Sequence, residues 1–240
     1  MSGKRKSPLQ YETTENGDVA IALEGAITTR PKAVAAKREF SFEVAFQLDH
    51  PRLVLLRDQK PPLHFHPYQE EYIQVLEGRL CVEMEGKEHI LTKKDGEICV
   101  RPWTNHRLYP PPPTDGPSGR RTVFLLSGSV TDEPFKLDEV FFENWYAYQE
   151  QIVTHGKRVN VLQVMSMFDA GGSYLSLPQW VPFGKQLAYA MGITMGRYLG
   201  AILGYQPFYW EWTTNWEEAC RKMETCLFQR RFAVRDYGSN

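Results

Sequence analysis

Three histidines and a glutamate are spaced in this sequence as the ligands of a metal ion would be. His64 and His66 stand two residues apart, so on an extended strand both imidazoles point to the same face. Glu71 follows after the Pro67-Tyr68 bend and begins another strand, and His106 comes at the end of a later one. Imidazole and carboxylate ligands together suit Fe, Mn, Ni, Cu or Zn and leave coordination positions open. We therefore expect His64, His66, Glu71 and His106 to be both metal ligands and catalytic residues of one pocket.

Short strands separated by turns surround these four residues. Strands are predicted over residues 71–76, 79–85, 89–92, 98–100 and 122–126. Upstream, apolar residues alternate with polar or small ones at Phe40, Phe42, Val44 and Phe46, and a further strand is expected at residues 53–56. Strands with turns every eight to twelve residues are typical of a β-sandwich or barrel, so the elements that position the site are predicted to be β.

The spacing of these residues resembles the two sequence motifs of the cupin superfamily. The segment His64–Glu71, followed by Gly78 after six residues, is similar to the first motif: Gly, five residues, His-x-His, three or four residues, Glu, six residues, Gly. The segment Gly96–His106 is similar to the second motif. The match covers roughly residues 58–106 and implies a small barrel whose metal ligands point into its mouth.

Two positions depart from the cupin pattern. Asp58 stands where the first motif has its leading glycine, and the turn after Pro102 is one residue shorter than usual and lacks its glycine, which could re-aim His106. Glu70 is a neighbouring carboxylate, but the six-residue spacing to Gly78 selects Glu71. The flanking segments Leu-Asp-His-Pro and Arg-Pro-Trp-x-Asn-His-Arg-Leu-Tyr-Pro-Pro are similar to small cupins of filamentous fungi, which are often encoded beside natural-product pathways.

The second half of the chain has a helical pattern. Apolar residues at three- and four-residue spacing predict a helix from Leu137 to Ile152, residues 159–168 fit either a helix or a strand, and a second helix is expected from Phe183 to Gly204. Glycines recur every fourth residue in that second helix, at Gly192, Gly196, Gly200 and Gly204, and form a groove that another backbone can enter.

This apolar helix has aromatic residues at both ends, a pattern compatible with contact either with protein or with a membrane. We expect it to pack on the barrel or on a partner chain. The alternatives are contact of residues 183–212 with a membrane surface and, last, a true span, because Arg197 at the bilayer centre would cost at least about 2.5 kcal/mol.

Composition limits the function classes. Of the 240 residues, 42% are hydrophobic and 24% charged, and the net charge of −1 gives no support for nucleic-acid binding. The four cysteines form no Cys-x-x-Cys pair and no apolar leader follows the start methionine, so we expect free thiols and a cytoplasmic location, with membrane association left open. The expected division is a polar tail at 1–18, a cupin barrel at 19–130 with an extended Pro110–Pro113 loop, and a mostly helical extension at 131–240.

The predicted fold class is therefore mainly β: a single jelly-roll cupin barrel with a helical C-terminal extension. Ile73, Val75 and Leu108 share strand parity with the candidate ligands, and Trp103 and Tyr109 flank His106. We expect these five to bind substrate, and since they are apolar or aromatic, the substrate is expected to be an apolar small molecule.

Three functions fit this reading. The first is a biosynthetic enzyme of secondary metabolism in which a divalent transition metal assists dioxygenation, isomerisation or dehydration. The second is a metal-independent cyclase or isomerase that folds a polyene-like substrate by shape and acid–base chemistry. The third is a non-catalytic small-molecule-binding cupin. A homodimer is compatible with each of them.

Overall fold

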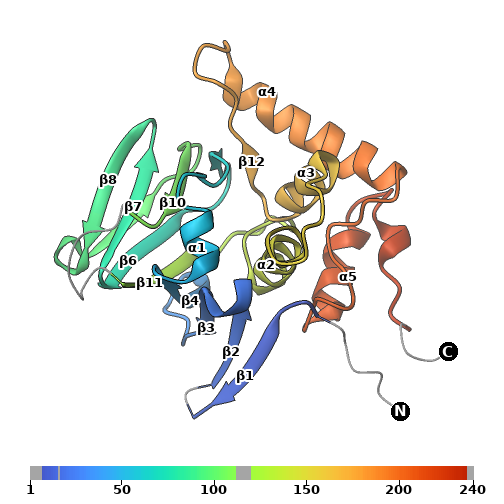
Figure 1. The fold of residues 1–240 in the computed structure, drawn as a ribbon. Coiled ribbons are helices and arrows are strands. Elements are labelled where there is room, and N and C mark those ends of the chain that lie inside the picture. Colours follow the sequence, from blue (N-terminus) through green and yellow to red (C-terminus); the bar gives the residue numbers. More distant parts are fainter. Residues whose placement is uncertain (1–6, 16, 112–119, 237–240) are drawn as a thin grey trace. The chain divides into compact units, whose positions relative to one another are not determined.

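The computed structural model describes residues 7–15, 17–111 and 120–236 (Figure 1). The chain divides into a β unit, residues 10–131, and a helical unit, residues 132–240 together with 1–9. Residues 1–6 and 16 of the expected tail and residues 112–113 of the expected proline loop lie outside the described residues.

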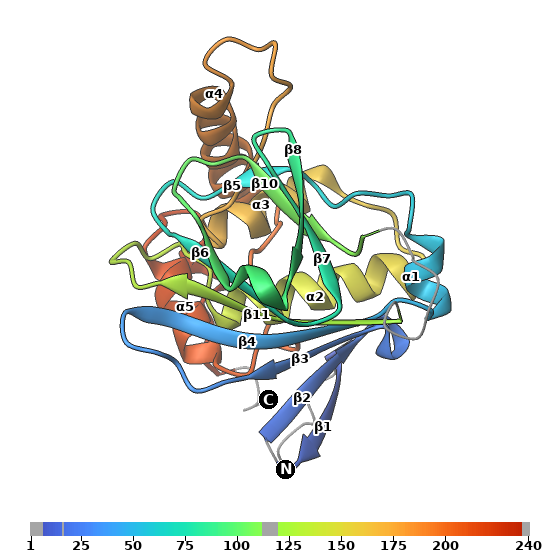
Figure 2. The same cartoon turned by 90° about the vertical axis from the view of Figure 1, so that its left-hand side faces the viewer.

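Two antiparallel sheets form the β unit (Figures 1 and 2). The larger sheet has the order β1-β2-β3-β4-β11-β6-β9. Its strands are β1 (Gln10–Thr14), β2 (Gly17–Ala22), β3 (Ile27–Pro31), β4 (Arg38–Gln47), β6 (Glu71–Glu77), β9 (Glu97–Val100) and β11 (Arg121–Ser129). In the smaller sheet β5, β10, β7 and β8 follow one another. Their bounds are β5 (His64–Phe65), β7 (Arg79–Met84), β8 (Lys87–Thr92) and β10 (His106–Tyr109).

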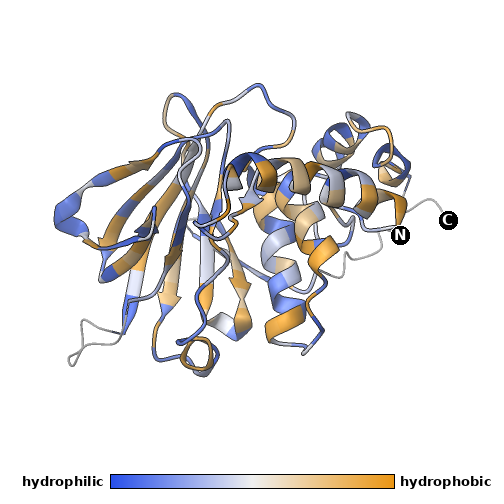
Figure 3. Cartoon of the chain, turned by 90° about the horizontal axis from the view of Figure 1, so that it is seen from above, coloured by the Kyte–Doolittle hydropathy of each residue, from blue (hydrophilic) through white to orange (hydrophobic). Residues whose placement is uncertain are grey.

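Alternating side chains build the core between the sheets. In β6 the side chains of Glu71, Ile73 and Val75 are buried, and the residues between them are not. The strand register places residues of three neighbouring strands on this same face of the sheet: Ile73 lies opposite Leu126 of β11, and Leu126 lies opposite Phe42 of β4. The colouring of Figure 3 shows this alternation of hydrophilic and hydrophobic residues along the strands. The period-two pattern thus turns the candidate carboxylate inward.

Two segments differ from the sequence-based expectation. Residues 10–14, assigned to the polar tail, form β1, because pairing with β2 satisfies their backbone groups although their side chains are mostly exposed. Residues 53–56, predicted as a strand, belong largely to the short helix α1 (Pro51–Leu55). Pro51 occupies its first turn, and Nδ1 of His50 accepts a hydrogen bond from the backbone N–H of Arg52. Capping therefore outweighed the local apolar pattern.

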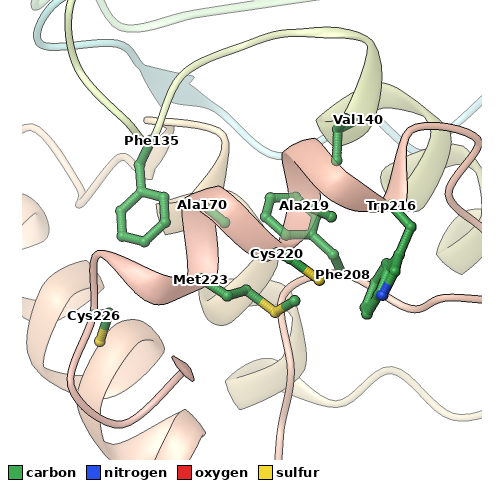
Figure 4. Close-up of a cluster of buried hydrophobic side chains, with 9 residues drawn as sticks. All are labelled: Phe135, Val140, Ala170, Phe208, Trp216, Ala219, Cys220, Met223 and Cys226. Carbon is green, nitrogen blue, oxygen red and sulfur yellow. The ribbon is translucent and has the colours of Figure 1, made fainter. Parts of the chain in front are cut away.

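The helical unit is built around its own apolar core. Its elements are α2 (Glu139–Val153), α3 (Val161–Ala170), the short strand β12 (Tyr174–Leu175), α4 (Gly184–Met191), a π-helical segment (Gly192–Gly200) and α5 (Trp216–Glu224). Three-residue 3₁₀ turns lie at 23–25, 93–95 and 230–232. Figure 4 shows the cluster in which Ala219, Cys220 and Met223 of α5 meet Phe208 and Val140. The predicted helix at 137–152 is confirmed, and residues 161–168 of the ambiguous stretch are helical.

The glycine ladder packs against α3 of the same unit. Gly192, Gly196 and Gly200 are buried, whereas Gly204 is exposed. A Cβ on Gly196 would overlap the backbone carbonyl of Met165 in α3. The glycine ladder was expected to pack on the barrel or on a partner chain, but at Gly196 it packs on a helix of its own unit. The segment predicted as one helix also changes to π geometry at Gly192. No helix among the described residues is both long and apolar enough to cross a bilayer.

Candidate metal centre

Strands from both sheets bring the four predicted ligands together. β5 and β10 are antiparallel neighbours, and His64 lies directly opposite His106 in their register. His66 follows β5 on the face of His64, and Glu71, the first residue of β6, reaches in from the other sheet. The ring centroids of His64 and His106 are 4.5 Å apart, and that of His66 is 5.1 Å from each of them.

The three imidazoles form a compact set of nitrogen donors. One ring nitrogen of each of His64, His66 and His106 lies within 4.8 Å of the other two. His106 is fully buried and His66 is 3% exposed, whereas His64 is half-buried. One edge of the cluster is therefore accessible to a ligand.

Backbone carbonyls orient two of the rings. Nδ1 of His106 donates to the carbonyl oxygen of Thr104 at 2.8 Å, and Nδ1 of His64 donates to that of Pro62 at 3.0 Å. A proton held on Nδ1 leaves Nε2 to face the cluster, which is the usual arrangement of metal-binding histidine. Sequence reasoning missed Pro62 and Thr104 because main-chain acceptors leave no residue-type signal.

Glu71 pairs with the histidines through one oxygen. Its Oε2 lies 2.7 Å from Nε2 of His106 and 3.9 Å from Nε2 of His66. Both ring nitrogens of His106 lie within hydrogen-bond distance of an oxygen atom, that of Thr104 and that of Glu71, which favours the protonated ring beside an ionised carboxylate. Burial alone lowers the pKa of His106, but the hydrogen bond and the charge of Glu71 raise it above its ordinary value. Burial likewise raises the pKa of Glu71, and the bond to His106 together with the neighbouring imidazoles outweighs it, bringing that pKa to about 2.

His64 remains neutral in these surroundings. Desolvation of the His64 ring by the surrounding protein disfavours its charged form and lowers its pKa. The charge of His106 lowers that pKa further. These two effects outweigh the carboxylate of Glu71 and the bond to Pro62, so the pKa of His64 falls to about 4. At neutral pH its Nε2 therefore offers a lone pair.

This donor set fits a first-row transition metal. Three imidazole nitrogens and a carboxylate oxygen are the ligands such ions take, and they meet without a lysine or arginine among them. Binding of a cation by these residues would require His106 to give up a ring proton, because metal ligands are deprotonated. His64, His66 and His106 thus form a site suited to a transition metal, with Glu71 beside it.

The short turn before His106 uses a non-glycine residue in left-handed conformation. Trp103 has φ 63°, a region that glycine occupies most readily. Its N–H donates to the carbonyl oxygen of His66 at 2.8 Å, and its ring stacks on Phe65 with centroids 5.2 Å apart. These contacts tie the two motif segments together, and His106 is delivered to the cluster despite the missing glycine.

The five expected substrate-binding residues divide into two groups. Ile73 and Val75 are buried on the face of Glu71, and Leu108, half-buried, is on the face of His106. For Trp103 and Tyr109 the structure shows contacts of another kind. The Trp103 ring stacks on Phe65, which alternates away from the imidazoles.

Tyr109 belongs to a polar cluster on the opposite face of β10. Its hydroxyl donates to Glu83 at 3.4 Å and to Glu88, and Lys60 lies 5.0 Å from its ring. Strand parity turned Tyr109 away from His106, although the two are close in sequence.

Comparisons with known proteins agree with this geometry. The family described as "Cupin domain" matches residues 53–111. An oxidoreductase of Arthrobotrys oligospora is 42% identical over 231 residues, which cover 95% of this chain and 89% of that protein. The chain belongs to the cupin family.

Other cupin relatives carry related names. The oxidoreductase macE of Penicillium terrestre is 40% identical, over 77% of this chain and 72% of its own length. The epoxidase atD of Aspergillus terreus is 37% identical, over 76% of this chain and 56% of its own. Among solved structures, an RmlC-like cupin of Shewanella frigidimarina matches 53% of this chain and 98% of its own with 15% identity and a TM-score of 0.33.

These findings confirm the cupin fold and the resemblance to fungal pathway cupins. They also show that the chain is an enzyme, since relatives aligned over most of its length are named oxidoreductases. The isomerase and cyclase alternatives receive no support from these names.

Proposed function

We propose that this cupin is a metal-assisted oxidoreductase that converts an apolar small molecule in a biosynthetic pathway. The observation that carries the proposal is the cluster of ring nitrogens from His64, His66 and His106, with the Glu71 carboxylate 2.7 Å from His106. Enzymes named oxidoreductase and epoxidase among its relatives favour redox chemistry over the other reactions that a cupin metal site supports.

Each ligand candidate has a distinct role in this proposal. His64 presents a neutral nitrogen at neutral pH, and the carbonyls of Pro62 and Thr104 hold two imidazoles in the orientation required. Glu71 supplies the negative charge that balances a divalent ion, which would act as the Lewis acid and redox centre of the reaction. When that ion is removed, Nε2 of His106 holds a proton against Glu71.

The apolar surroundings support an apolar substrate. Ile73 and Val75 fill the inner face beside Glu71, and Leu108 extends the face of His106. Side chains of this kind exclude water from the reacting atoms and bind a substrate by its hydrocarbon surface. The half-buried position of His64 leaves the approach to the cluster open.

A turnover screen tests the proposal. Purified protein supplied with Fe, Mn, Ni, Cu or Zn in turn would be incubated in air with a panel of apolar hydroxylated ring compounds, and the products measured by mass spectrometry. We expect at least one metal to give a product changed by oxidation, and His64→Ala to abolish it. His89→Ala is the matched control, because His89 is exposed on β8. Equal oxidation by wild type and His64→Ala, or a product isomeric with its substrate, would contradict the proposal.

A further inference from the structure

The helical unit contains a pocket of about 170 Å³ of its own. Met165 and Phe168 of α3 line one side, Tyr174 and Leu177 another, and Ala188 and Met191 of α4 the third. All six residues belong to the helical unit, whereas the four candidate metal ligands belong to the β unit. The pocket is thus lined by residues other than the candidate metal ligands.

Polar contacts behind the pocket hold one wall in place. The hydroxyl of Tyr174 donates to Oδ1 of Asp169 at 3.1 Å, and Asp169 is fully buried. Arg197 donates to both carboxylate oxygens, at 2.8 and 3.0 Å. The ring of Tyr174 also meets Tyr189 edge-on, with centroids 4.8 Å apart. Asp169, Arg197 and Tyr189 thus fix the ring of Tyr174 at the pocket surface, which is more order than a packing defect requires.

The facing wall is a helix that changes geometry at the pocket. The π-helical segment begins at Gly192, which lines the pocket, and a Cβ there would overlap the ring of Tyr174. Further along, Gly196 rests against the backbone of Met165. Backbone contact at Gly196 prevents the helix from moving inward to fill the space, and π-helical segments occur frequently at functional sites.

The lining defines the chemistry of a ligand. None of the ten lining residues, all within the described part of the chain, carries a charge. Asp169 and Arg197 neutralise each other behind Tyr174, and the hydroxyl of Ser173 donates to the carbonyl of Gly171 at 3.3 Å. A charged molecule would lose its hydration here without gaining a counterion. An apolar cavity of about 150 Å³ admits a benzene molecule, so this one suits a single ring with a small substituent.

We propose that the helical unit binds an uncharged single-ring apolar molecule in this pocket, through residues other than the candidate metal ligands. Volume and wall chemistry favour this occupant, because about 170 Å³ accommodates one ring with a small substituent and the uncharged walls offer no counterion to an anion.

Methyl NMR on the full chain tests the site. Met165 and Met191 line the pocket, and Met84 of the β unit serves as an internal reference. With ¹³C-methyl-labelled methionine, titration with toluene should shift the Met165 and Met191 signals in a saturable manner and leave Met84 unchanged. Benzoate, of the same ring size but anionic, should leave all three signals unchanged. The proposal is overturned if toluene causes no saturable shift up to its solubility limit, or if benzoate binds equally well.

Paired alanine variants locate the binding. Ala188 is buried at the pocket, whereas Ala190 is exposed on the same helix. Ala188→Leu should fill the space and weaken toluene binding at least tenfold, and Ala190→Leu should leave the affinity within twofold. If Ala188→Leu fails to fold, Leu177→Ala provides the opposite change, and a larger pocket should bind naphthalene more tightly than wild type does. Unchanged affinities in these variants would place the toluene elsewhere and refute the site.

Discussion

At the scale of single residues, charge and orientation explain why these four side chains form a site. His64 and His106 carry opposite pKa shifts although they face each other, because Glu71 hydrogen-bonds to only one of them. Residue type and spacing were enough to predict the four candidate ligands. The carbonyls that orient the rings could not be predicted, because every residue has one.

Glu71 and Glu70 form a matched pair for testing the carboxylate. Oε2 of Glu71 contacts His106, whereas that of Glu70 accepts a hydrogen bond from Tyr72. Glu71→Gln should weaken metal binding at least about 10-fold, because the negative charge beside the imidazoles is lost. Glu70→Gln should bind metal as wild type does. Competition titration against a chromophoric chelator measures both affinities, and equal values for the two variants would remove Glu71 from the site.

Trp103 tests whether the short turn carries backbone strain. Both Trp103→Ala and Trp103→Gly lose the ring that stacks on Phe65, so they differ only in the cost of φ 63°. Trp103→Gly should therefore be more stable than Trp103→Ala by about 1 kcal/mol in urea unfolding. An alanine variant as stable as the glycine variant would show that the turn relaxes when the ring is removed.

At the scale of elements, the periodicity of apolar residues and the turn residues predicted most strands of the β unit. Capping and tertiary contacts determined the elements that these patterns did not predict. The Phe40–Phe46 alternation became β4, and the Leu137–Ile152 pattern became α2. Residues 53–56 were mispredicted because a proline and a capping histidine start a helix there. The π geometry at 192–200 arises where glycines meet α3, and a sequence pattern of glycines does not distinguish it from an ordinary α-helix.

Alanine substitutions at Gly196 and Gly184 distinguish the effect of close packing on stability from the effect of helix propensity. A Cβ at Gly196 would overlap the backbone of Met165, whereas at Gly184 it would meet only ordinary contacts of 3.7 Å or more. Gly196→Ala should lower the free energy of unfolding by about 1–3 kcal/mol. Gly184→Ala should be neutral or stabilising by up to about 1 kcal/mol, since alanine favours a helix. Urea unfolding followed by circular dichroism decides the matter, and a neutral Gly196→Ala would mean that the two helices separate easily.

At the scale of the whole molecule, each unit has its own buried apolar residues and its own candidate site. The sequence motifs identified the β unit, but the helical unit contains no motif from which a function could be predicted. Its core includes Phe208, Trp216 and Met223, so the segment after Gly204 is structural to that unit. Contact of residues 183–212 with a membrane surface was an alternative interpretation of the sequence, and within that range Phe208 is fully buried.

Separate cores predict separate effects of a core mutation. Met223 is fully buried in the helical unit, whereas Leu227 is 60% exposed. Met223→Ala should destabilise the helical unit by about 2–5 kcal/mol, and Leu227→Ala should change its stability little. Folded Met223→Ala should still bind metal with wild-type affinity, because the ligands lie in the β unit. A loss of metal affinity in parallel with stability would show that the helical unit supports the site.

The central claim is that the three histidines hold a transition metal, and elemental analysis of the purified full chain tests it most directly. The protein would be produced with Fe, Mn, Ni, Cu and Zn supplied and purified without chelators. We predict about one equivalent of a single transition metal in the wild type, as a site of three imidazoles and a carboxylate requires, and almost none in His66→Ala. His155→Ala, at an exposed position, should retain the full content. Wild-type protein without metal, or His66→Ala with undiminished metal, would contradict the claim.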